Sequence, residues 1–187
     1  MKLVTFALSA IFGALLFFSG CQDVELEAKG PIIPTCDAPK YEVLLPEGRI
    51  SVAQVSVKKE SERLFSKESF AELLDSVFKQ SNCFSFIQNA GQSAGAETFT
   101  LAVSYELKAD EESQDVNVLK SQDEVSLKSL IVLELHSKKK QIKQTSNGEL
   151  RISADRYFGL QNDNKLSRQD IKELLLRNLI FILNALK

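Results

Sequence analysis

The stretch TFTLAVSYEL, residues 98–107, alternates apolar and polar side chains without a break. Successive side chains of a strand point to opposite faces, so the alternation predicts a strand with one covered and one solvated face. The covered face would hold Phe99, Leu101, Val103, Tyr105 and Leu107. The stretch therefore predicts an antiparallel sheet, and the segments around it decide what covers that sheet.

Downstream, the pattern predicts two more strands. In VSLKSLIVLELH, residues 125–136, one face holds Val125, Leu127, Ile131, Leu133 and Leu135. A turn at 137–140 leads to QIKQTSNGELRIS, residues 141–153, where Asn147-Gly148 predicts a bend or bulge. The charged segment 108–124 between the first two strands predicts a mobile loop.

Upstream, ISVAQVSV at 50–57 and CFSFI at 83–87 predict two shorter strands. The alternation in ISVAQVSV changes phase at Ala53-Gln54, which is typical of a strand buried on both faces or of a bulge.

Two segments predict helices. Residues 66–80 begin at the N-cap candidate Ser66 and repeat apolar residues with helical spacing, and Phe65 with Phe70 forms a hydrophobic staple. Residues 166–187 begin with Ser167 and Asp170, which approximate a capping box. The predicted fold is therefore α+β: a mixed sheet of about five strands with two helices on one face, in the order β-α-β-β-β-β-α.

The C-terminal helix carries more apolar residues than one buried stripe requires. The main stripe holds Ile171, Leu174, Leu175, Leu179, Ile182, Leu183 and Leu186. A second set, Leu176, Ile180 and Phe181, lies off that stripe. Two interpretations stay open: a helix wedged between the sheet and the N-terminal tether, or a docking face for a partner or a second copy.

The first residues predict export. Lys2 is followed by an apolar run from Leu3 to Phe18 and then by Ser19, Gly20 and Cys21, a secretory signal that is similar to a bacterial lipobox. The run is shorter than the ~20 residues that span a bilayer. We therefore expect a lipoprotein signal peptide at 1–20 and a covalent lipid such as palmitate on Cys21. The residue after the cysteine is Gln22 rather than Asp, which by resemblance to enterobacterial sorting rules permits transfer to the outer membrane. The expected location is therefore the outer membrane, facing the periplasm.

The exported chain divides into a polar, Pro-containing tether at 21–40 and a single domain at 41–187. Besides Cys21 it has Cys36 and Cys83. Leftover thiols tend to pair in an oxidising compartment, so a Cys36–Cys83 disulfide would fix the tether to the domain, although two separate thiols stay an alternative.

Several classes of function find no support in the sequence. The charge is weakly acidic, with 23 Lys and Arg against 25 Asp and Glu, which argues against nucleic acid as a partner. His136 is the only histidine and no Cys-x-x-Cys occurs, so we expect neither a metal nor another cofactor besides the covalent lipid. No constellation of catalytic groups is recognisable, so we expect no enzymatic activity.

The order of elements resembles a known family. Tyr41-Glu42-Val43-Leu44, the following ISVAQVSV, the turn before FSFI, the short gap from Ile87 to Thr98, the long hairpin and the C-terminal helix are similar to ABC-type transport auxiliary lipoproteins. This resemblance implies a non-enzymatic adaptor of a lipid-transport machine. The same order is similar to penicillin-binding-protein activator and curli-secretion lipoproteins, so an activator of cell-wall synthesis or a subunit of an outer-membrane secretion assembly is the alternative.

The expected partners are thus the membrane, through the lipid, and an envelope protein or a second copy. A lipid carrier is a further hypothesis, and it would require an enclosed apolar cavity between helices and sheet.

Overall fold

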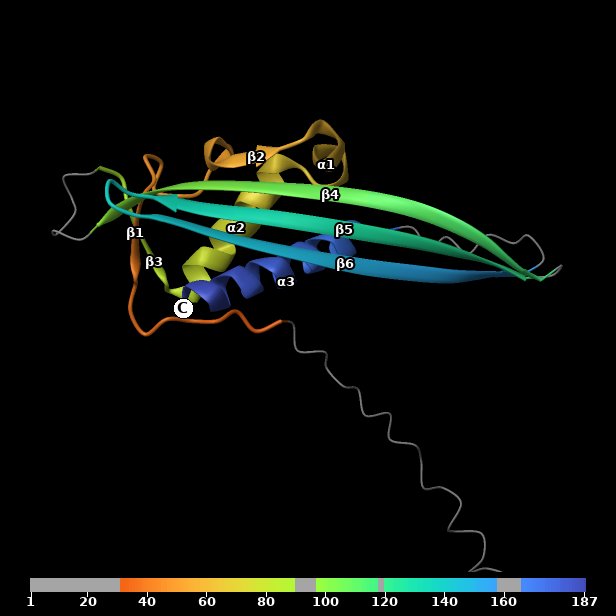
Figure 1. Ribbon diagram of the computed structural model, residues 1–187. Coiled ribbons are helices and arrows are strands. Elements are labelled where there is room, and N and C mark those ends of the chain that lie inside the picture. The colour runs from red at the N-terminus through yellow and green to blue at the C-terminus, as the bar shows by residue number, and fades with distance from the viewer. Residues whose placement is uncertain (1–30, 90–96, 118–119, 158–165) are drawn as a thin grey trace, which may run out of the picture. The chain divides into compact units, whose positions relative to one another are not determined.

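Three long antiparallel strands organise the fold (Figure 1). The computed structural model describes residues 31–89, 97–117, 120–157 and 166–187. The three strands are β4 (Thr98–Asn117), β5 (Lys120–His136) and β6 (Gln141–Tyr157). Their registers pair Thr100 with His136 and His136 with Gln141, so consecutive hairpins build the sheet.

Shorter strands extend this sheet beyond β4. The strand β1 (Tyr41–Leu44) pairs in parallel with both β3 (Phe84–Ile87) and the start of β4, which gives the order β3-β1-β4-β5-β6. The strand β2 (Val55–Val57) also pairs in parallel with β4, further along the same edge. The sheet is therefore mixed and has six strands rather than the expected five, because residues 41–44 also pair.

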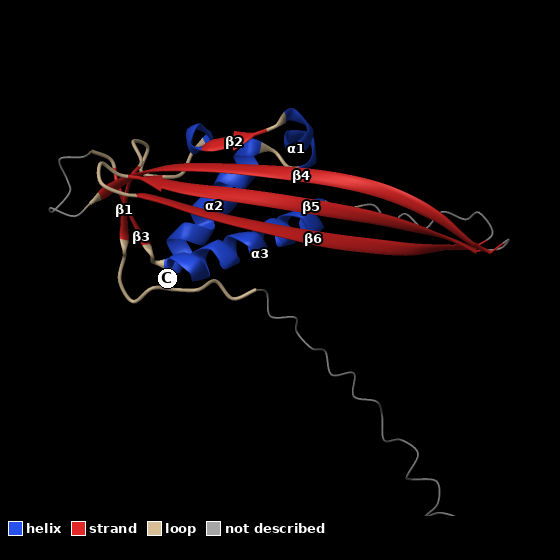
Figure 2. Cartoon of the chain, in the orientation of Figure 1, coloured by secondary structure: helices blue, strands red, loops and turns tan. Residues whose placement is uncertain are grey.

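Two helices cover one face of the sheet, as Figures 1 and 2 show for α2 (Lys67–Ser81) and α3 (Arg168–Leu186). Ser66 caps α2 by accepting a hydrogen bond from the Ser69 N–H, and Ser167 with Asp170 forms the complete capping box of α3. Both helices and the α+β class are as the sequence predicts.

The core lies between these helices and the inner face of the sheet. The predicted inner residues Phe99, Leu101, Val103, Tyr105 and Leu107 are all buried. The rings of Phe70 on α2 and Tyr105 on β4 stack with centroids 4.3 Å apart, and the whole predicted stripe of α3 is buried. The strand face predicted from alternation and the helix stripe predicted from helical spacing thus pack into one core.

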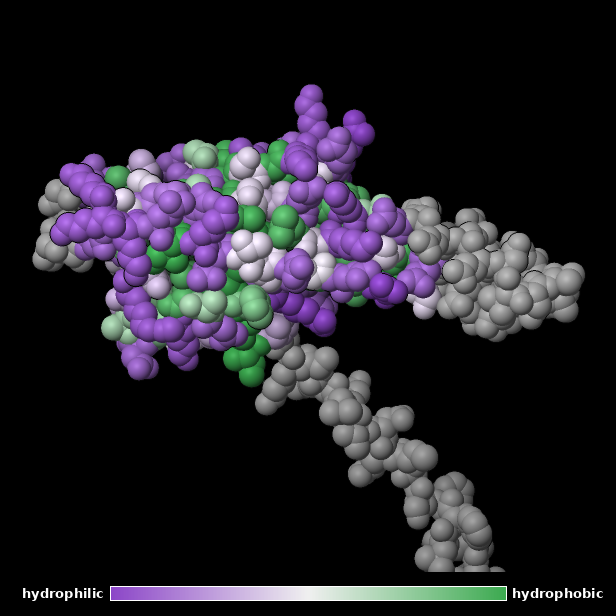
Figure 3. Space-filling view, in the orientation of Figure 1, coloured by the Kyte–Doolittle hydropathy of each residue, from purple (hydrophilic) through white to green (hydrophobic). Residues whose placement is uncertain are grey.

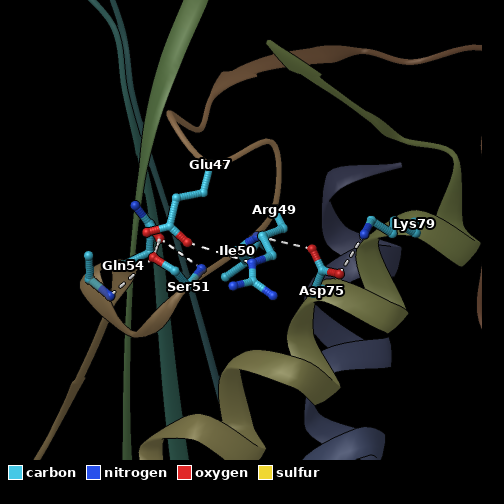
Figure 4. Close-up of polar contacts among 8 residues, drawn as sticks. Glu47, Arg49, Ile50, Ser51, Gln54, Asp75 and Lys79 are labelled. Atoms are coloured by element: carbon cyan, nitrogen blue, oxygen red, sulfur yellow. Dashed lines mark hydrogen bonds and ion pairs between the residues drawn. The ribbon is translucent and has the colours of Figure 1, made fainter. Parts of the chain in front are cut away.

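The prediction of a strand across residues 50–57 is wrong in its first half. Residues Val52–Gln54 form a 3-10 turn, η1, and only Val55–Val57 pair. Ser51 and Gln54 form a capping box in which the Ser51 N–H donates to Gln54 Oε1 at 2.9 Å (Figure 4). Nearby, Asp75 Oδ1 accepts from the Ile50 N–H at 3.0 Å, which fixes this segment to α2. The change of phase at Ala53-Gln54 therefore marks a turn.

A short helix, α1 (Lys59–Leu64), has no counterpart in the sequence prediction. Its only buried residue is Ser61, so it presents no apolar stripe that a pattern could reveal. The Ser61 hydroxyl accepts from the Leu107 N–H at 2.9 Å and donates to the Leu107 carbonyl oxygen at 3.2 Å. Ser61 thus takes the place of a strand partner on the edge of β4 just beyond β2.

The expected mobile loop at 108–124 is also wrong. The β4–β5 pairing continues through this segment to Asn117 and Lys120, and β6 follows β5 to Tyr157. Asp, Glu and Asn have low strand propensity, so the composition indicated a loop. The backbone ladder between neighbouring strands outweighs that local preference.

The predicted bend at Asn147-Gly148 is not present. Both residues pair in regular register, Asn147 with Leu130 and Gly148 with Ser129. Gly148 instead faces α3: a Cβ at this position would lie 2.7 Å from Asn178 Oδ1 and 3.0 Å from Leu174 Cδ1. The glycine serves the close approach of helix and strand.

Candidate docking surface on the C-terminal helix

The outer side of α3 carries the three apolar residues that the sequence singled out. Phe181 is 63% exposed, whereas Leu176 and Ile180 are half-buried and Leu176 packs against the core. In Figure 3, apolar residues on the side in view are interrupted by polar ones. Phe181 is therefore the most accessible of the three for a partner.

These residues do not form one continuous patch. A helix turns ~100° per residue, so Phe181 lies about 140° around α3 from Leu176 and about 100° from Ile180. Between them lies Arg177, whose Nη2 is 2.5 Å from Glu173 Oε1. The ion pair separates a flank with Leu176 and Ile180 from a flank with Phe181. A partner that contacts all three would also have to accommodate the charges.

The two flanks of α3 have different neighbours. Leu174 and Asn178 approach Gly148, so the side of α3 that they occupy faces β6. Phe181 follows them by seven and three residues and lies on the same side. Near the start of α3, Arg168 donates to Ser69 Oγ and lies 5.7 Å from the centroid of the Phe65 ring, so the opposite flank faces α2.

A groove of ≈ 570 Å³ opens between the starts of α2 and α3. Six of its eight lining residues are polar or charged; the lining is Phe65, Ser69, Glu72, Leu73, Ser76, Arg168, Gln169 and Lys172. A lipid carrier needs an enclosed apolar cavity, and this groove is open and has polar and charged residues in its lining. The groove thus gives the lipid-carrier hypothesis no support.

The end of the predicted tether lies against the domain. Cys36 is joined to Cys83 by a disulfide, and both cysteines are buried. The Cys36 N–H donates to the Ser81 carbonyl oxygen at 2.8 Å, and Asn82 Nδ2 donates to the Cys36 carbonyl oxygen at 3.1 Å. Residues around Cys36 are therefore held at the C-terminal end of α2. The lipidation candidate Cys21 and the signal at 1–20 lie outside the described residues.

An ionic cluster on the outer face of the sheet includes the only histidine. Glu134 lies 2.8 Å from Lys143 Nζ and 3.1 Å from His136 Nε2. The hydrogen bond from Lys143, followed by that from His136, lowers the pKa of the Glu134 carboxyl. Among the described residues, no group of three or more His, Cys, Asp or Glu side chains could hold a metal ion.

The free edge of the sheet is a feature that the sequence analysis missed. Within the described part of the chain, β6 pairs with β5 on one side and with no strand on the other. Its outer face carries Lys143 and Glu149, both exposed. The alternation of QIKQTSNGELRIS gave a strand, but pairing order is a property of the whole sheet and could not be derived from this segment.

In the described ranges, no helix combines the length and the apolar character needed to cross a membrane. No protein-family model and no curated protein sequence matches the chain.

Three solved structures show a weak likeness. A neuraminyllactose-binding hemagglutinin homologue from Helicobacter pylori aligns with a TM-score of 0.40 and 13% identity over 84% of this chain and 91% of its own. The hypothetical protein CT253 from Chlamydia trachomatis aligns with a TM-score of 0.35 and 11% identity over 80% of this chain and 94% of its own. Rare lipoprotein B from Shewanella oneidensis aligns with a TM-score of 0.24 and 13% identity over 78% of this chain and 87% of its own. TM-scores this low assign neither a family nor an activity to the chain.

Proposed function

We propose that this protein is a non-enzymatic, lipid-anchored adaptor of the bacterial envelope. It would be held on the outer membrane by the lipid on Cys21, face the periplasm and serve as an auxiliary component of a lipid-transport machine. The observation that carries this proposal is the signal that ends in Gly20-Cys21, because acyl chains on that cysteine would attach the domain to a bilayer. A transport role follows from the resemblance in element order alone.

The disulfide supports the export that the proposal requires. Such bonds persist in oxidising compartments, and Cys36–Cys83 joins the end of the tether to the end of α2. A pull on the tether would reach the domain at this bond. The adaptor would therefore present its folded part at a distance set by the residues between Cys21 and Cys36.

The docking part of the proposal rests on α3. An exposed phenylalanine contributes apolar area that a partner can bury, and Phe181 is the largest exposed apolar side chain of this helix. Ile180 lies half-exposed on the other side of the Glu173–Arg177 pair. Both positions can be changed without opening the core, whereas Leu176 packs against it.

The anchor is tested by growing cells with a labelled fatty acid and separating their membranes. We expect the wild-type chain to carry the label and to sediment with the outer membrane. Cys21→Ser should lose the label and the membrane attachment. A labelled or membrane-bound Cys21→Ser variant would refute the anchor.

Docking is tested by crosslinking the chain in native membranes and identifying the captured proteins by mass spectrometry. Subunits of a lipid transporter would support the proposal, and their capture should fall in Ile180→Asp/Phe181→Asp but not in the matched control Asn184→Asp, an exposed residue of the same helix. Capture of cell-wall synthases or of secretion-channel subunits would replace the transport role with one of the alternatives.

A further inference from the structure

The free edge of β6 has a sequence that is complementary to itself. An unpaired edge offers a row of backbone donors and acceptors to another strand. When a second β6 is placed antiparallel with Ser146 opposite Ser146, Lys143 faces Glu149 and Ile142 faces Leu150. A two-fold axis repeats each of these pairs. We infer that two copies of this chain pair through β6 and join their sheets at a two-fold axis through Ser146.

Charge on the outer face favours this register. Within one copy, Glu134 on β5 pairs with Lys143 on β6 at 2.8 Å, and Lys128 on β5 lies opposite Glu149 in the register. Across the joint, each Lys143 would meet a Glu149 of the second copy. The resulting row crosses four strands with alternating signs, from Glu134 through Lys143 and Glu149 to Lys128, and opposite charges in facing positions stabilise a sheet.

Neighbouring registers lack this match. With Asn147 opposite itself, Lys143 would face Arg151, and like charges in facing positions are destabilising. With Thr145 opposite itself, Lys143 would face Asn147 and Ile142 would face Gly148. The register centred on Ser146 is the one of the three that pairs both opposite charges and apolar residues.

The helix below the edge leaves room for a second copy. Asn178 donates to Ser129 of β5 at 2.6 Å and also approaches Gly148 of β6, so α3 runs beneath the β5–β6 pair. With strands about 4.8 Å apart, the midline of this pair is about 5 Å from the axis. Where they pass beneath Gly148, the two α3 helices would then be about 10 Å apart, close to the 8–10 Å of packed helices.

The C-terminal end of α3 slants away from the β6 edge (Figure 1). Tyr41 Oη on β1 donates to the Leu186 carbonyl oxygen at 3.1 Å, and β1 lies on the other side of β4 from β6 in the sheet order. The C-terminal end of the helix is therefore remote from the joint.

Charge reversal tests the inference with the full chain. Two differently tagged copies are co-expressed, membranes are dissolved in mild detergent, and co-purification of the second tag is measured. Lys143→Glu alone should weaken pairing about tenfold or more, because a carboxylate at position 143 then faces the Glu149 carboxylate in both 143–149 contacts of the joint. Glu149→Lys alone should do the same, because two ammonium groups then face each other in both contacts. Co-expression of Lys143→Glu with Glu149→Lys should restore pairing, since opposite charges again meet in both 143–149 contacts of the joint. Lys172→Glu, an exposed charge on α3, is the matched control and should pair like the wild type.

Recovery of co-purification in the mixture distinguishes a loss of pairing from a loss of folding. Each copy still carries its own substitution in the mixture, so a folding defect caused by that substitution would not be repaired. A second measurement uses cysteines: Thr145→Cys and Asn147→Cys face each other only between different copies. Their mixture should form an intermolecular disulfide that neither variant forms alone. No co-purification of the wild type, unchanged pairing of the single variants, or no recovery in the mixture would overturn the inference. It stands or falls separately from the lipid anchor, which these variants leave intact.

Discussion

Gly148 provides a sharp test of how α3 is seated on the sheet. Among the described glycines only Gly48 has a positive φ, so the backbone at Gly148 does not require glycine. The space around this position does require glycine, because a Cβ would lie 2.7 Å from Asn178 Oδ1, closer than carbon and oxygen can approach. Asn178 cannot easily move away, because it is buried and its Nδ2 donates to Ser129 Oγ at 2.6 Å.

We therefore expect Gly148→Ala to lower the free energy of unfolding. Overpacking a well-filled site costs about 1–3 kcal/mol. The same change stiffens the unfolded chain and offsets about 0.4–1 kcal/mol of that cost. The midpoints of these two ranges leave a net loss of about 1.3 kcal/mol, which corresponds to a fall in Tm of about 3–5 °C for a chain of this size.

The assay is urea unfolding with the disulfide intact, performed as a double-mutant cycle with Asn178→Ala. Asn178→Ala alone should also destabilise, because it removes the hydrogen bond to Ser129. In that background the clash with Asn178 is absent and only the 3.0 Å approach to Leu174 Cδ1 remains, so Gly148→Ala should cost at least about 0.5 kcal/mol less than in the wild type. Asn147→Ala, the exposed neighbour, is the matched control. A Gly148→Ala protein as stable as the wild type, or the same cost in both backgrounds, would refute the packing argument.

Three further predictions concern stability. Cys83→Ser should lower the free energy of unfolding by about 4 kcal/mol in oxidising buffer, because the bond closes a loop with a sequence separation of 47, and an equal loss in reductant would contradict this. Ser61→Ala should cost about 1–3 kcal/mol, measured by urea unfolding, because it leaves the buried Leu107 N–H and carbonyl without their partner, and a neutral effect would mean that water replaces the hydroxyl. Burial raises the pKa of Tyr105, with smaller contributions from Glu62 and Glu68, so the protonated phenol stabilises the fold. That stability is complete below the unfolded pKa of about 10 and is lost as pH rises above it; Tyr105→Phe should flatten the alkaline limb of a plot of stability against pH, and an unchanged limb would assign it to other groups.

The sequence by itself determined the elements whose pattern is local. The alternation at 98–107 and 125–136 reports which side chains share a face, and the caps Ser66 and Ser167 mark where helices begin. These signals depend on neighbours a few residues apart, so they survive without tertiary context. The α+β class follows from their order.

Tertiary structure alone decided the features that depend on distant partners. The charged residues at 108–117 and 120–124 are strands because the β4–β5 ladder continues through them, and Ser61 completes the edge of β4 from a helix without an apolar stripe. Gly148 resembled a turn signal, but the side chain of Asn178 above it explains the glycine.

The candidate site shows the same division. Sequence spacing found Leu176, Ile180 and Phe181 off the buried stripe of α3, but it did not show which of them remain accessible. The fold leaves Phe181 exposed on the β6 side and buries part of Leu176, with the Glu173–Arg177 ion pair between the flanks. Exposure depends on which surfaces other elements cover, and those elements are remote in sequence. The free edge of β6 arises in the same way, from the order of strands in the sheet and not from any residue of that strand.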